Sequence, residues 1–376
     1  MVFALKGSRV FDGDAMRDGL AIIVDGNRIR EVAPIEKISR GVKSIELEGG
    51  ILAPGFIDVQ VNGGGGALLN DNPTLETVKC IAESHRKFGT TGMLPTVITD
   101  APNILAQAIG AVRDAQNANI PGVLGIHIEG PFLDVDRKGA HDPQYIRDMT
   151  IGDVGQIAEA KCGVVMITLA PNRVPTALIK SLVVQNILVS LGHSNATAVE
   201  IQAALDAGAS AFTHIFNAMS QLTGREPGMV GMALADDKSY CGLIADGLHV
   251  HDIAMKVAIA AKAKSRVMLI SDAMPAAAGG PDEFELQGRT VTRVDGRLIL
   301  DDGTLAGSNL TMDEALRHCV NKLDVGLEDA LRMTSLNPAS FMHIDHELGR
   351  IRPGYRASLV HLSDSLEVKQ TWIDGK

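Results

Sequence analysis

Between Gly50 and about residue 274, short apolar runs rich in Val and Ile alternate with segments whose apolar residues recur every three or four positions. Runs of the first kind predict buried parallel strands, and segments of the second kind predict amphipathic helices. The predicted strands span residues 51–61, 90–98, 122–130, 163–171, 187–194, 208–217, 239–250 and 266–274. Eight strand–helix units in roughly 250 residues predict an α/β fold of the (β/α)8 TIM-like barrel type.

The two chain ends have a different pattern, in which short strand-like runs follow one another without helices. In residues 1–52 the turn dipeptides Asp12-Gly13 and Asp25-Gly26 separate such runs, and residues 353–376 have the same character. Neither end is long enough to form a stable sheet with its own core. We therefore expect the two ends to pair into one small β-sandwich domain, beside a barrel domain formed by residues 53–352.

Residues 283–308 depart from the barrel pattern after the last predicted barrel strand. The turn dipeptides Asp295-Gly296 and Asp302-Gly303 lie between short strand-like runs, which predicts a β-hairpin insertion near the top of the barrel. Helical patterns follow at residues 309–322 and 327–338 before the chain returns to the small domain.

Composition narrows the class of protein. The chain has 376 residues, of which 45% are hydrophobic and 21% charged, as in ordinary globular domains. No apolar run approaches the roughly 18 residues that span a bilayer, and Lys6 and Arg9 interrupt the start of the chain before a signal-peptide core forms. We expect a soluble, untargeted protein without a membrane partner.

Charge and cysteine content also favour a cytoplasmic protein that acts on a small molecule. The net charge is −10 and the sequence contains no basic block, so we expect a small-molecule substrate rather than nucleic acid or an anionic membrane. The cysteines lie far apart, without metal or redox spacing, at Cys80, Cys162, Cys241 and Cys319. We expect all of them to be buried apolar residues in a protein of the reducing cytoplasm.

Candidate chemistry concentrates at the carboxyl ends of the predicted strands, where side chains from different strands of a TIM barrel converge. Glu129, His193 and His214 lie at three of these ends, and we predict that they bind one catalytic divalent metal ion, with water completing its shell. His249 and Asp272 lie at two more. His127 shares a strand face with Glu129, and two interpretations stay open for it, support of the site and plain packing.

The neighbouring sequence suggests roles for Asp272, Arg225 and the glycine-rich run at 62–67. For Asp272 we favour a general acid/base beside the metal over a structural helix cap. Arg225, in a loop after the sixth predicted strand, is a candidate partner for an anionic substrate group, although its spacing alone is a weak signal. The run NGGGGA at 62–67 suggests a phosphate loop but lacks the Lys-Ser/Thr of a Walker motif, and close backbone packing explains it equally well.

Several short segments match a known motif set in chain order: PGFIDVQVNGGGG, HIEGPFL, KGAH, LGHSNA, THIFNAM, IADGLHV, SDAM and DGTLAGS. These segments resemble those of the N-acetylglucosamine-6-phosphate deacetylases, a branch of the amidohydrolase superfamily. The match runs from about Pro54 to Gly307 and continues in the C-terminal NPA and PGYRASLV. PGFID is shared by many amidohydrolases, whereas HIEGP with LGHSNA, THIFNAM and DGLHV is specific to the deacetylases.

The resemblance implies site residues as well as a family. It gives Glu129, His193 and His214 as metal ligands and Asp272 as the catalytic aspartate, in agreement with the inference from strand ends. It also implies which residues hold the sugar and its phosphate, with Arg225 and His249 facing the phosphate. This set is Ala140, His141, Asn217, Ala218, Arg225, His249, Leu305, Ala306 and Gly307.

The resemblance also bears on the cofactor and the assembly. Many amidohydrolases have an HxH pair at the end of the first barrel strand, where this chain has Gln60 and Asn62, and amide side chains are poor zinc ligands. We therefore expect one divalent metal ion per subunit rather than two. Zinc is the first expectation, with iron, manganese or cobalt as alternatives. A homodimer is what the family implies.

The implied reaction is hydrolysis of the N-acetyl group of N-acetylglucosamine 6-phosphate to glucosamine 6-phosphate and acetate, in amino-sugar catabolism and cell-wall sugar recycling. Three alternatives stay open. One is a deacylase of another N-acyl amino sugar. A second is a cyclic-amide hydrolase, which the absent HxH pair and Glu129 at the place of a bridging lysine weaken. The third is a non-catalytic sugar-phosphate-binding paralogue, which Asp272 and the complete ligand set weaken.

Overall fold

The computed structural model describes residues 2–39 and 41–376. Its centre is an eight-stranded parallel sheet in the order β17-β16-β15-β14-β13-β12-β11-β8. A parallel bridge between Val61 and Ala273 joins the first strand to the last, so the sheet closes into a barrel. The strands are β8 (Phe56–Val61), β11 (Thr90–Ile98), β12 (Gly125–Glu129), β13 (Val164–Leu169), β14 (Leu188–Leu191), β15 (Ala211–Phe212), β16 (Tyr240–Ile244) and β17 (Val267–Ile270). The predicted (β/α)8 barrel is confirmed.

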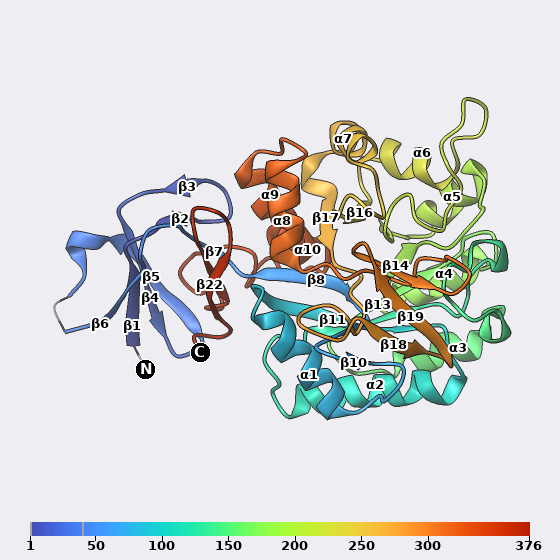
Figure 1. The fold of residues 1–376 in the computed structure, drawn as a ribbon, viewed down its shortest axis with the longest axis horizontal. Helices are drawn as coiled ribbons and strands as arrows, with labels where there is room; N and C mark the ends of the chain where they lie inside the picture. Colours follow the sequence, from blue (N-terminus) through green and yellow to red (C-terminus); the bar gives the residue numbers. More distant parts are fainter. Residues whose placement is uncertain (1, 40) are drawn as a thin grey trace.

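Helices cover the outside of the barrel and bury their apolar faces against the strands (Figure 1). They are α1 (Leu75–Arg86), α2 (Pro102–Asn117), α3 (Ile151–Ala158), α4 (Thr176–Val184), α5 (Ala198–Asp206), α6 (Gly228–Ala235), α7 (Asp252–Ala261), α8 (Met312–Asn321), α9 (Leu327–Thr334) and α10 (Leu336–Phe341). Helices α3 and α5 begin at capping boxes formed by Thr150 with Asp153 and by Thr197 with Glu200. Single 3-10 turns are η1 (Ile35–Lys37), η2 (Val135–Arg137), η3 (Pro143–Tyr145) and η4 (Lys264–Arg266).

Three predicted strands differ most in extent from the observed ones, and one of them, 239–250, forms only β16 and ends at Ile244. The run 51–61 is two strands in different sheets, β7 (Ile51–Pro54) and β8, because the chain passes from the end domain to the barrel at Gly55. A Cβ atom at Gly55 would lie 2.2 Å from the Thr91 side chain, so only glycine fits that crossing. The run 208–217 forms only β15, since the backbone after Phe212 turns into left-handed conformations at His214 and Phe216.

The two chain ends share two small sheets at one side of the barrel, and both termini lie in this part (Figure 1). One sheet has the order β5-β4-β1-β6 and the other β22-β21-β7-β2-β3, in which the C-terminal strand β21 pairs antiparallel with β7. Their shared core includes Phe3, Leu5, Val10, Leu359 and Trp372. The strands are β1 (Val2–Lys6), β2 (Arg9–Phe11), β3 (Met16–Arg17), β4 (Leu20–Asp25), β5 (Arg28–Pro34), β6 (Lys43–Glu46), β21 (Leu359–Leu362) and β22 (Val368–Trp372).

The insertion forms a three-stranded antiparallel sheet of β18 (Glu283–Leu286), β19 (Arg289–Val294) and β20 (Arg297–Leu300). It packs Leu286 and Leu298 against Met274, which follows the last barrel strand. Gln287 also donates to the Thr99 carbonyl over 2.8 Å. The insertion is therefore fixed to the end of the barrel at which the strands terminate.

The glycine run after β8 is explained by packing. Strands β9 (Gly63–Gly64) and β10 (Ala67–Leu68) form a tight hairpin there. A Cβ atom would lie 2.5 Å from the His85 ring at Gly64 and 2.0 Å from the Ser84 hydroxyl at Gly65. The glycines thus let this hairpin sit directly on α1.

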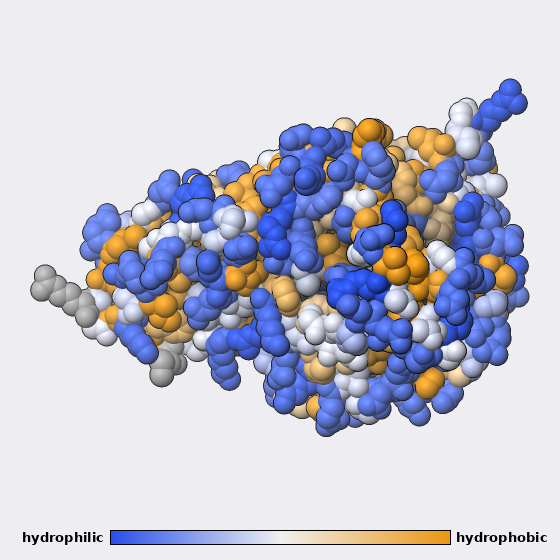
Figure 2. Space-filling model, viewed as in Figure 1, coloured by the Kyte–Doolittle hydropathy of each residue, from blue (hydrophilic) through white to orange (hydrophobic). Residues whose placement is uncertain are grey.

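The surface and the cysteines complete the description. Hydrophilic side chains cover most of the face seen in Figure 2, with apolar side chains in small groups between them. None of the helices in the described residues combines the length and the apolarity that a membrane crossing demands. Cys162, Cys241 and Cys319 are buried free thiols, whereas Cys80 is only half-buried, against the expectation for that residue.

Candidate metal-dependent active site

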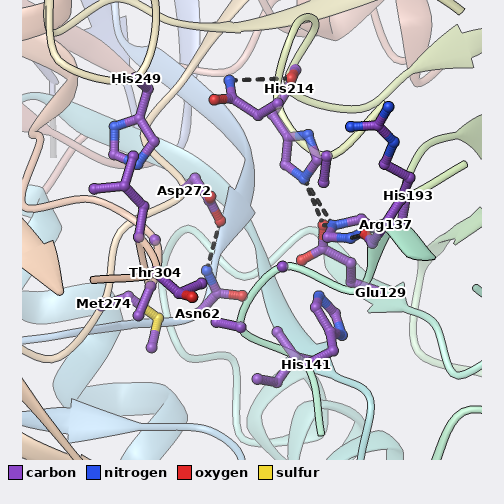
Figure 3. A pocket seen from close by; sticks show the side chains of 18 of the residues that line it. Asn62, Glu129, Arg137, His141, His193, His214, His249, Asp272, Met274 and Thr304 are labelled. Atoms are coloured by element: carbon purple, nitrogen blue, oxygen red, sulfur yellow. Dashed lines mark hydrogen bonds and ion pairs between the residues drawn. The ribbon is translucent and has the colours of Figure 1, made fainter. Parts of the chain in front are cut away.

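Three predicted ligand atoms converge on one point at the carboxyl ends of the strands. The Nε2 atoms of His193 and His214 are 3.0 Å apart, and they lie 3.3 and 3.1 Å from Oε1 of Glu129. Ligand atoms of a tetrahedral zinc ion stand roughly 3.3 Å apart, since each bond is about 2.0–2.1 Å long. The Glu129, His193 and His214 side chains therefore fit one divalent metal ion in their present positions (Figure 3).

The hydrogen bonds around these ligands also fit a metal. His193 Nδ1 donates to the Arg137 carbonyl over 2.8 Å, which leaves the Nε2 lone pair free for a cation. Two buried imidazole nitrogens that face each other at 3.0 Å need a proton or a cation between them. Burial raises the pKa of Glu129, but the two histidines outweigh it and hold that pKa well below its usual range. Glu129 is thus ionised, as a carboxylate that binds a metal must be.

Backbone conformation aims these side chains. His193, His214 and Asp272 each lie two residues after their strands, and their φ angles are 47°, 30° and 51°. Left-handed backbone costs a residue other than glycine on the order of 1 kcal/mol or more, and such strain clusters at functional sites. The turn bends the chain at the end of each strand, so that the side chain points across the barrel mouth.

Asp272 lies beside the ligand cluster and differs from Glu129 in its surroundings. Asn62 Nδ2 donates to Asp272 Oδ1 over 2.8 Å, and Gln60 Nε2 reaches the same oxygen at 3.1 Å. Burial, followed by the charge of Glu129, raises the pKa of Asp272 to about 6. A carboxyl group with that pKa exchanges protons near neutral pH, which suits a general acid/base.

His141 supplies a neutral imidazole to the site. Its Nδ1 lies 2.8 Å from the Thr99 hydroxyl, which can donate or accept, and 3.3 Å from the Thr99 backbone N–H, which can only donate, so that the proton of a neutral ring belongs on Nε2. Burial, and then the neighbouring His193, lower the pKa of His141 to about 3. The ring is therefore a hydrogen-bond donor without a charge.

His249 is held by a carboxylate that sequence reasoning did not single out. Asp246 Oδ2 lies 2.6 Å from His249 Nδ1, and Asp246 Oδ1 accepts from the backbone N–H groups of Leu248 and His249. The buried Nε2 of His249 has no partner within the described residues. The signal in the sequence was the i, i+3 spacing of Asp246 and His249 in DGLH.

A pocket of about 350 Å³ joins these side chains and has the size of a small-molecule site. With the exception of Arg225, every predicted site residue lines it: Glu129, Ala140, His141, His193, His214, Asn217, Ala218, His249, Asp272, Leu305, Ala306 and Gly307. At Gly307, φ is +63° and a Cβ atom would lie 2.4 Å from Met274. This glycine is what lets the loop after the insertion close on the pocket.

Arg225 lies elsewhere. It is exposed in the loop between residues 220 and 227 and does not line the pocket. The assignment of Arg225 to the phosphate remains a prediction. The pocket instead has Arg137 on its wall, a cation that the sequence analysis did not identify although it stands four residues before His141. His127 lies one layer deeper, where its Nε2 is 2.8 Å from the Thr168 hydroxyl.

Together the fold and the site define a metal-dependent hydrolase built on a (β/α)8 barrel. The sequence pattern of the amidohydrolase family matches residues 51–376, and that of the NagA composite domain matches residues 2–52. The chain therefore belongs to the amidohydrolase family and, within it, to the deacetylases of N-acetyl amino-sugar 6-phosphates, which confirms the resemblance.

Relatives along the whole chain support this placement. The chain is 42% identical to an N-acetylgalactosamine-6-phosphate deacetylase from Shewanella sp. (strain ANA-3), over 96% of this chain and 94% of that protein. It is 36% identical to an N-acetylglucosamine-6-phosphate deacetylase from Haemophilus influenzae, over 96% of this chain and 95% of that protein.

Solved structures of deacetylases also superimpose closely on this chain. A crystal structure of the N-acetylglucosamine-6-phosphate deacetylase from Pasteurella multocida superimposes with a TM-score of 0.97 at 34% identity, covering 100% of this chain and 99% of that one. A point mutant of the N-acetyl-D-glucosamine-6-phosphate deacetylase from Mycobacterium smegmatis, in complex with N-acetyl-D-glucosamine-6-phosphate, superimposes with a TM-score of 0.93 at 28% identity. The superposition covers 100% of this chain and 98% of that one.

Proposed function

We propose that the protein hydrolyses the acetamide of N-acetylglucosamine 6-phosphate to glucosamine 6-phosphate and acetate. The observation that carries this proposal is the convergence of Glu129 Oε1 and the two histidine Nε2 atoms within 3.3 Å of one another, beside Asp272 in the same pocket. A metal ligand set next to a carboxylate with a raised pKa is the machinery that amide hydrolysis requires.

Glu129, His193 and His214 would hold the metal, for which zinc is our first candidate among zinc, iron, manganese and cobalt. When bound there, a divalent metal ion supplies a Lewis acid that acidifies water and polarises a carbonyl. One ion per chain is what this ligand set accommodates, because Gln60 and Asn62 offer amide groups in place of histidines.

Side chains of this protein would carry out the proton transfers and stabilise the developing oxyanion. Asp272 takes a proton from the attacking water and delivers it to the amide nitrogen as the C–N bond breaks, so that the nitrogen departs as a neutral amine. His141, neutral and with its proton on Nε2, donates to the carbonyl oxygen as negative charge develops there. The second proton of the water remains on the new carboxyl group and passes to the amine or to solvent as acetate forms, and Asp272 ends the cycle ionised.

The sugar and its phosphate are assigned to the rest of the pocket. We propose that Asn217, Ala218 and the segment Leu305–Gly307 position the sugar, and that His249 contacts the phosphate through its Nε2. The fixed Asp246–His249 pair supports this role, because Asp246 holds Nδ1 over 2.6 Å and leaves the buried Nε2 without a partner in the described residues. Arg225 stays a second candidate for the phosphate.

A second candidate substrate is N-acetylgalactosamine 6-phosphate, which differs only in the configuration at C4. The specific observation that favours it is the 42% identity to a protein of that name. The chemistry at the acetamide is the same in both cases. The difference lies in the part of the pocket that contacts the sugar hydroxyl groups.

We propose to test both with one assay: release of free amine by the purified, metal-analysed protein from the two 6-phosphates and from unphosphorylated N-acetylglucosamine. Turnover of a 6-phosphate with strong preference over the unphosphorylated sugar supports the proposal, and the faster 6-phosphate identifies the substrate. Turnover of none of the three contradicts it.

We further propose that the protein acts in the cytoplasm as a homodimer. Free thiols at its cysteines agree with a reducing compartment. Helices α5 and α7, which both contact α6, and the loop before α6 carry exposed apolar side chains that a second subunit would cover: Val199, Leu222, Ile253 and Val257. Sedimentation of the purified protein as a monomer at micromolar concentration would contradict the dimer.

A further inference from the structure

The end of β8 carries two amide side chains that point at carboxylates rather than at a metal. Gln60 and Asn62 are each only 1% exposed. Gln60 Nε2 donates to Glu129 Oε1 over 3.0 Å and to Asp272 Oδ1 over 3.1 Å. Asn62 Nδ2 donates to the same Asp272 Oδ1 over 2.8 Å (Figure 3). The two amides therefore connect the metal ligand to the catalytic carboxylate.

The orientation of both amides follows from their neighbours. A rotated Gln60 would set its oxygen against two carboxylates, and a rotated Asn62 would set its oxygen against Asp272. In the observed orientation Asn62 Oδ1 is buried without a partner among the described residues and lies at the pocket wall. An amide that served packing alone would not leave a buried acceptor unpaired at the site of reaction.

Main-chain contacts fix the pair relative to Asp272. The Asp272 N–H donates to the Gln60 carbonyl over 2.9 Å, and the Asn62 N–H donates to the Ala273 carbonyl over 2.9 Å. Asp272 itself has left-handed backbone. The carboxylate is therefore placed from both sides, by its own turn and by the strand opposite.

We propose that Gln60 and Asn62 are positioning residues that form an amide clamp on Asp272. Both hold Oδ1, so Oδ2 is left as the oxygen that exchanges the proton with water and amine. Gln60 also keeps the like-charged carboxylates of Glu129 and Asp272 apart by placing one N–H against each. This inference rests on the proposed function, because it describes the same acid/base.

The experiment compares Asn62→Ala and Gln60→Met with the wild-type protein, each purified and analysed for metal. Loss of a donor to Oδ1 lets the carboxylate rotate, so we expect kcat to fall by about 10- to 100-fold while KM changes by less than about threefold. Metal content is expected to stay near one ion per chain. The two variants together guard against the failure of either one to fold.

A second arm asks whether the amides act through Asp272. In an Asp272→Asn background the clamp has no carboxylate to hold, so adding Asn62→Ala is expected to cause no further loss of kcat. Asn337→Ser is the matched control. Asn337 is also a buried asparagine, but it donates to the Val267 carbonyl at the opposite end of β17, so its loss is expected to lower stability and leave kcat unchanged.

Three results would overturn the clamp: kcat within about twofold of wild type in both variants, losses that multiply in the Asp272→Asn background, or a fall in activity that follows loss of metal. These are distinguishable from failure of the proposed function. Wild-type protein that turns over neither 6-phosphate contradicts the proposed function and the clamp together, whereas an active wild type with unaffected variants contradicts the clamp alone.

Discussion

Two buried carboxylates in one pocket have pKa values shifted in opposite directions, and their immediate neighbours set the difference. Glu129 receives both imidazoles, and its pKa lies well below the usual range despite burial. Asp272 receives only amide N–H groups, and burial and the charge of Glu129 raise its pKa to about 6. Environments that push two carboxyl pKa values apart separate a fixed ligand from a group that carries protons.

The first prediction concerns that proton carrier. Asp272→Asn retains the shape of the side chain but cannot accept a proton, so turnover of N-acetylglucosamine 6-phosphate is expected to fall by roughly 10²- to 10⁴-fold. Metal content and sugar binding, measured by elemental analysis and calorimetry, are expected to persist. Near-normal turnover would remove Asp272 from the acid/base role.

The second prediction follows from the pKa of Asp272. Only the ionised carboxylate accepts a proton from water, so kcat at saturating substrate is expected to decline as pH falls through about 6. A bound divalent cation favours the ionised form and moves this decline to lower pH. The measurement is kcat against pH on metal-loaded protein. A kcat that rises toward acid pH would contradict the assignment.

Residues of the site were predictable where a reactive side chain stands at the end of a strand. Glu129, His193, His214, His249 and Asp272 all met that condition, and they all line the pocket. Gln60, Asp246 and Arg137 were not predicted as members of the site, because their roles depend on partners far away in the sequence or on loop geometry. The pattern of apolar residues along the chain predicts strands and helices, but it does not show which polar side chains, such as Gln60 or Arg137, will face the site.

Among the elements, the insertion shapes the substrate side of the pocket. Arg289 on β19 donates to the Ala140 carbonyl over 2.6 Å, and Ala140 precedes His141. Leu286 and Thr304 at the ends of the insertion line the pocket. The insertion therefore supports the loop that carries the neutral imidazole.

The third prediction tests that support. Arg289→Ala removes the contact to Ala140, and a small displacement of His141 is expected to lower kcat/KM by about tenfold, since misplacement of a group by about 1 Å is costly. Arg293→Ala is the control, because Arg293 stands on the same strand but pairs with Asp282 at the surface. Equal activity of the two variants would show that the insertion does not position His141.

The sequence predicted which segments form strands better than it predicted where each strand begins and ends. Strand β11 was predicted with its observed bounds, because a long Thr-rich run with Met, Leu, Val and Ile is fully buried there. The 51–61 run hid a change of sheet at Gly55, since both strands are apolar; the turn dipeptide Pro54-Gly55 is the signal that marks the break. The 208–217 run was too long because left-handed backbone at His214 has no sequence signature.

At the scale of the whole molecule, the two chain ends close a small domain that stands apart from the pocket. Trp372 on β22 is 4% exposed and packs in its core. Arg86 of α1 donates to the Lys376 carbonyl and so attaches this end to the barrel. Stability and catalysis are thus separable in this protein.

The fourth prediction uses that separation. Trp372→Ala leaves a large cavity and is expected to lower the free energy of unfolding by about 3–5 kcal/mol, while kcat and metal content of the folded protein stay unchanged. Gln370→Ala is the control on the same strand, where the side chain is exposed. It is expected to have little effect on the free energy of unfolding or on kcat. Thermal unfolding and the amine-release assay check both. A Trp372→Ala protein with normal stability would contradict this packing.

The barrel and the pairing of the chain ends were predictable, because period and element order restrict the topology. Boundaries near residues 52 and 353 stay a prediction, as do the homodimer and the role of Arg225. A surface loop such as 220–227 is not restricted by burial, so neither its place nor its partner follows from a pattern of apolar residues.

Amide hydrolysis by this protein is proposed to depend on one metal ion held by Glu129, His193 and His214. The most direct measurement is amine release from N-acetylglucosamine 6-phosphate by metal-stripped protein titrated with Zn²⁺, beside Glu129→Gln. We expect negligible activity without metal, a rise that saturates at about one ion per chain, and weak or absent recovery in Glu129→Gln. Full activity of the stripped protein, or saturation only at about two ions per chain, would contradict it.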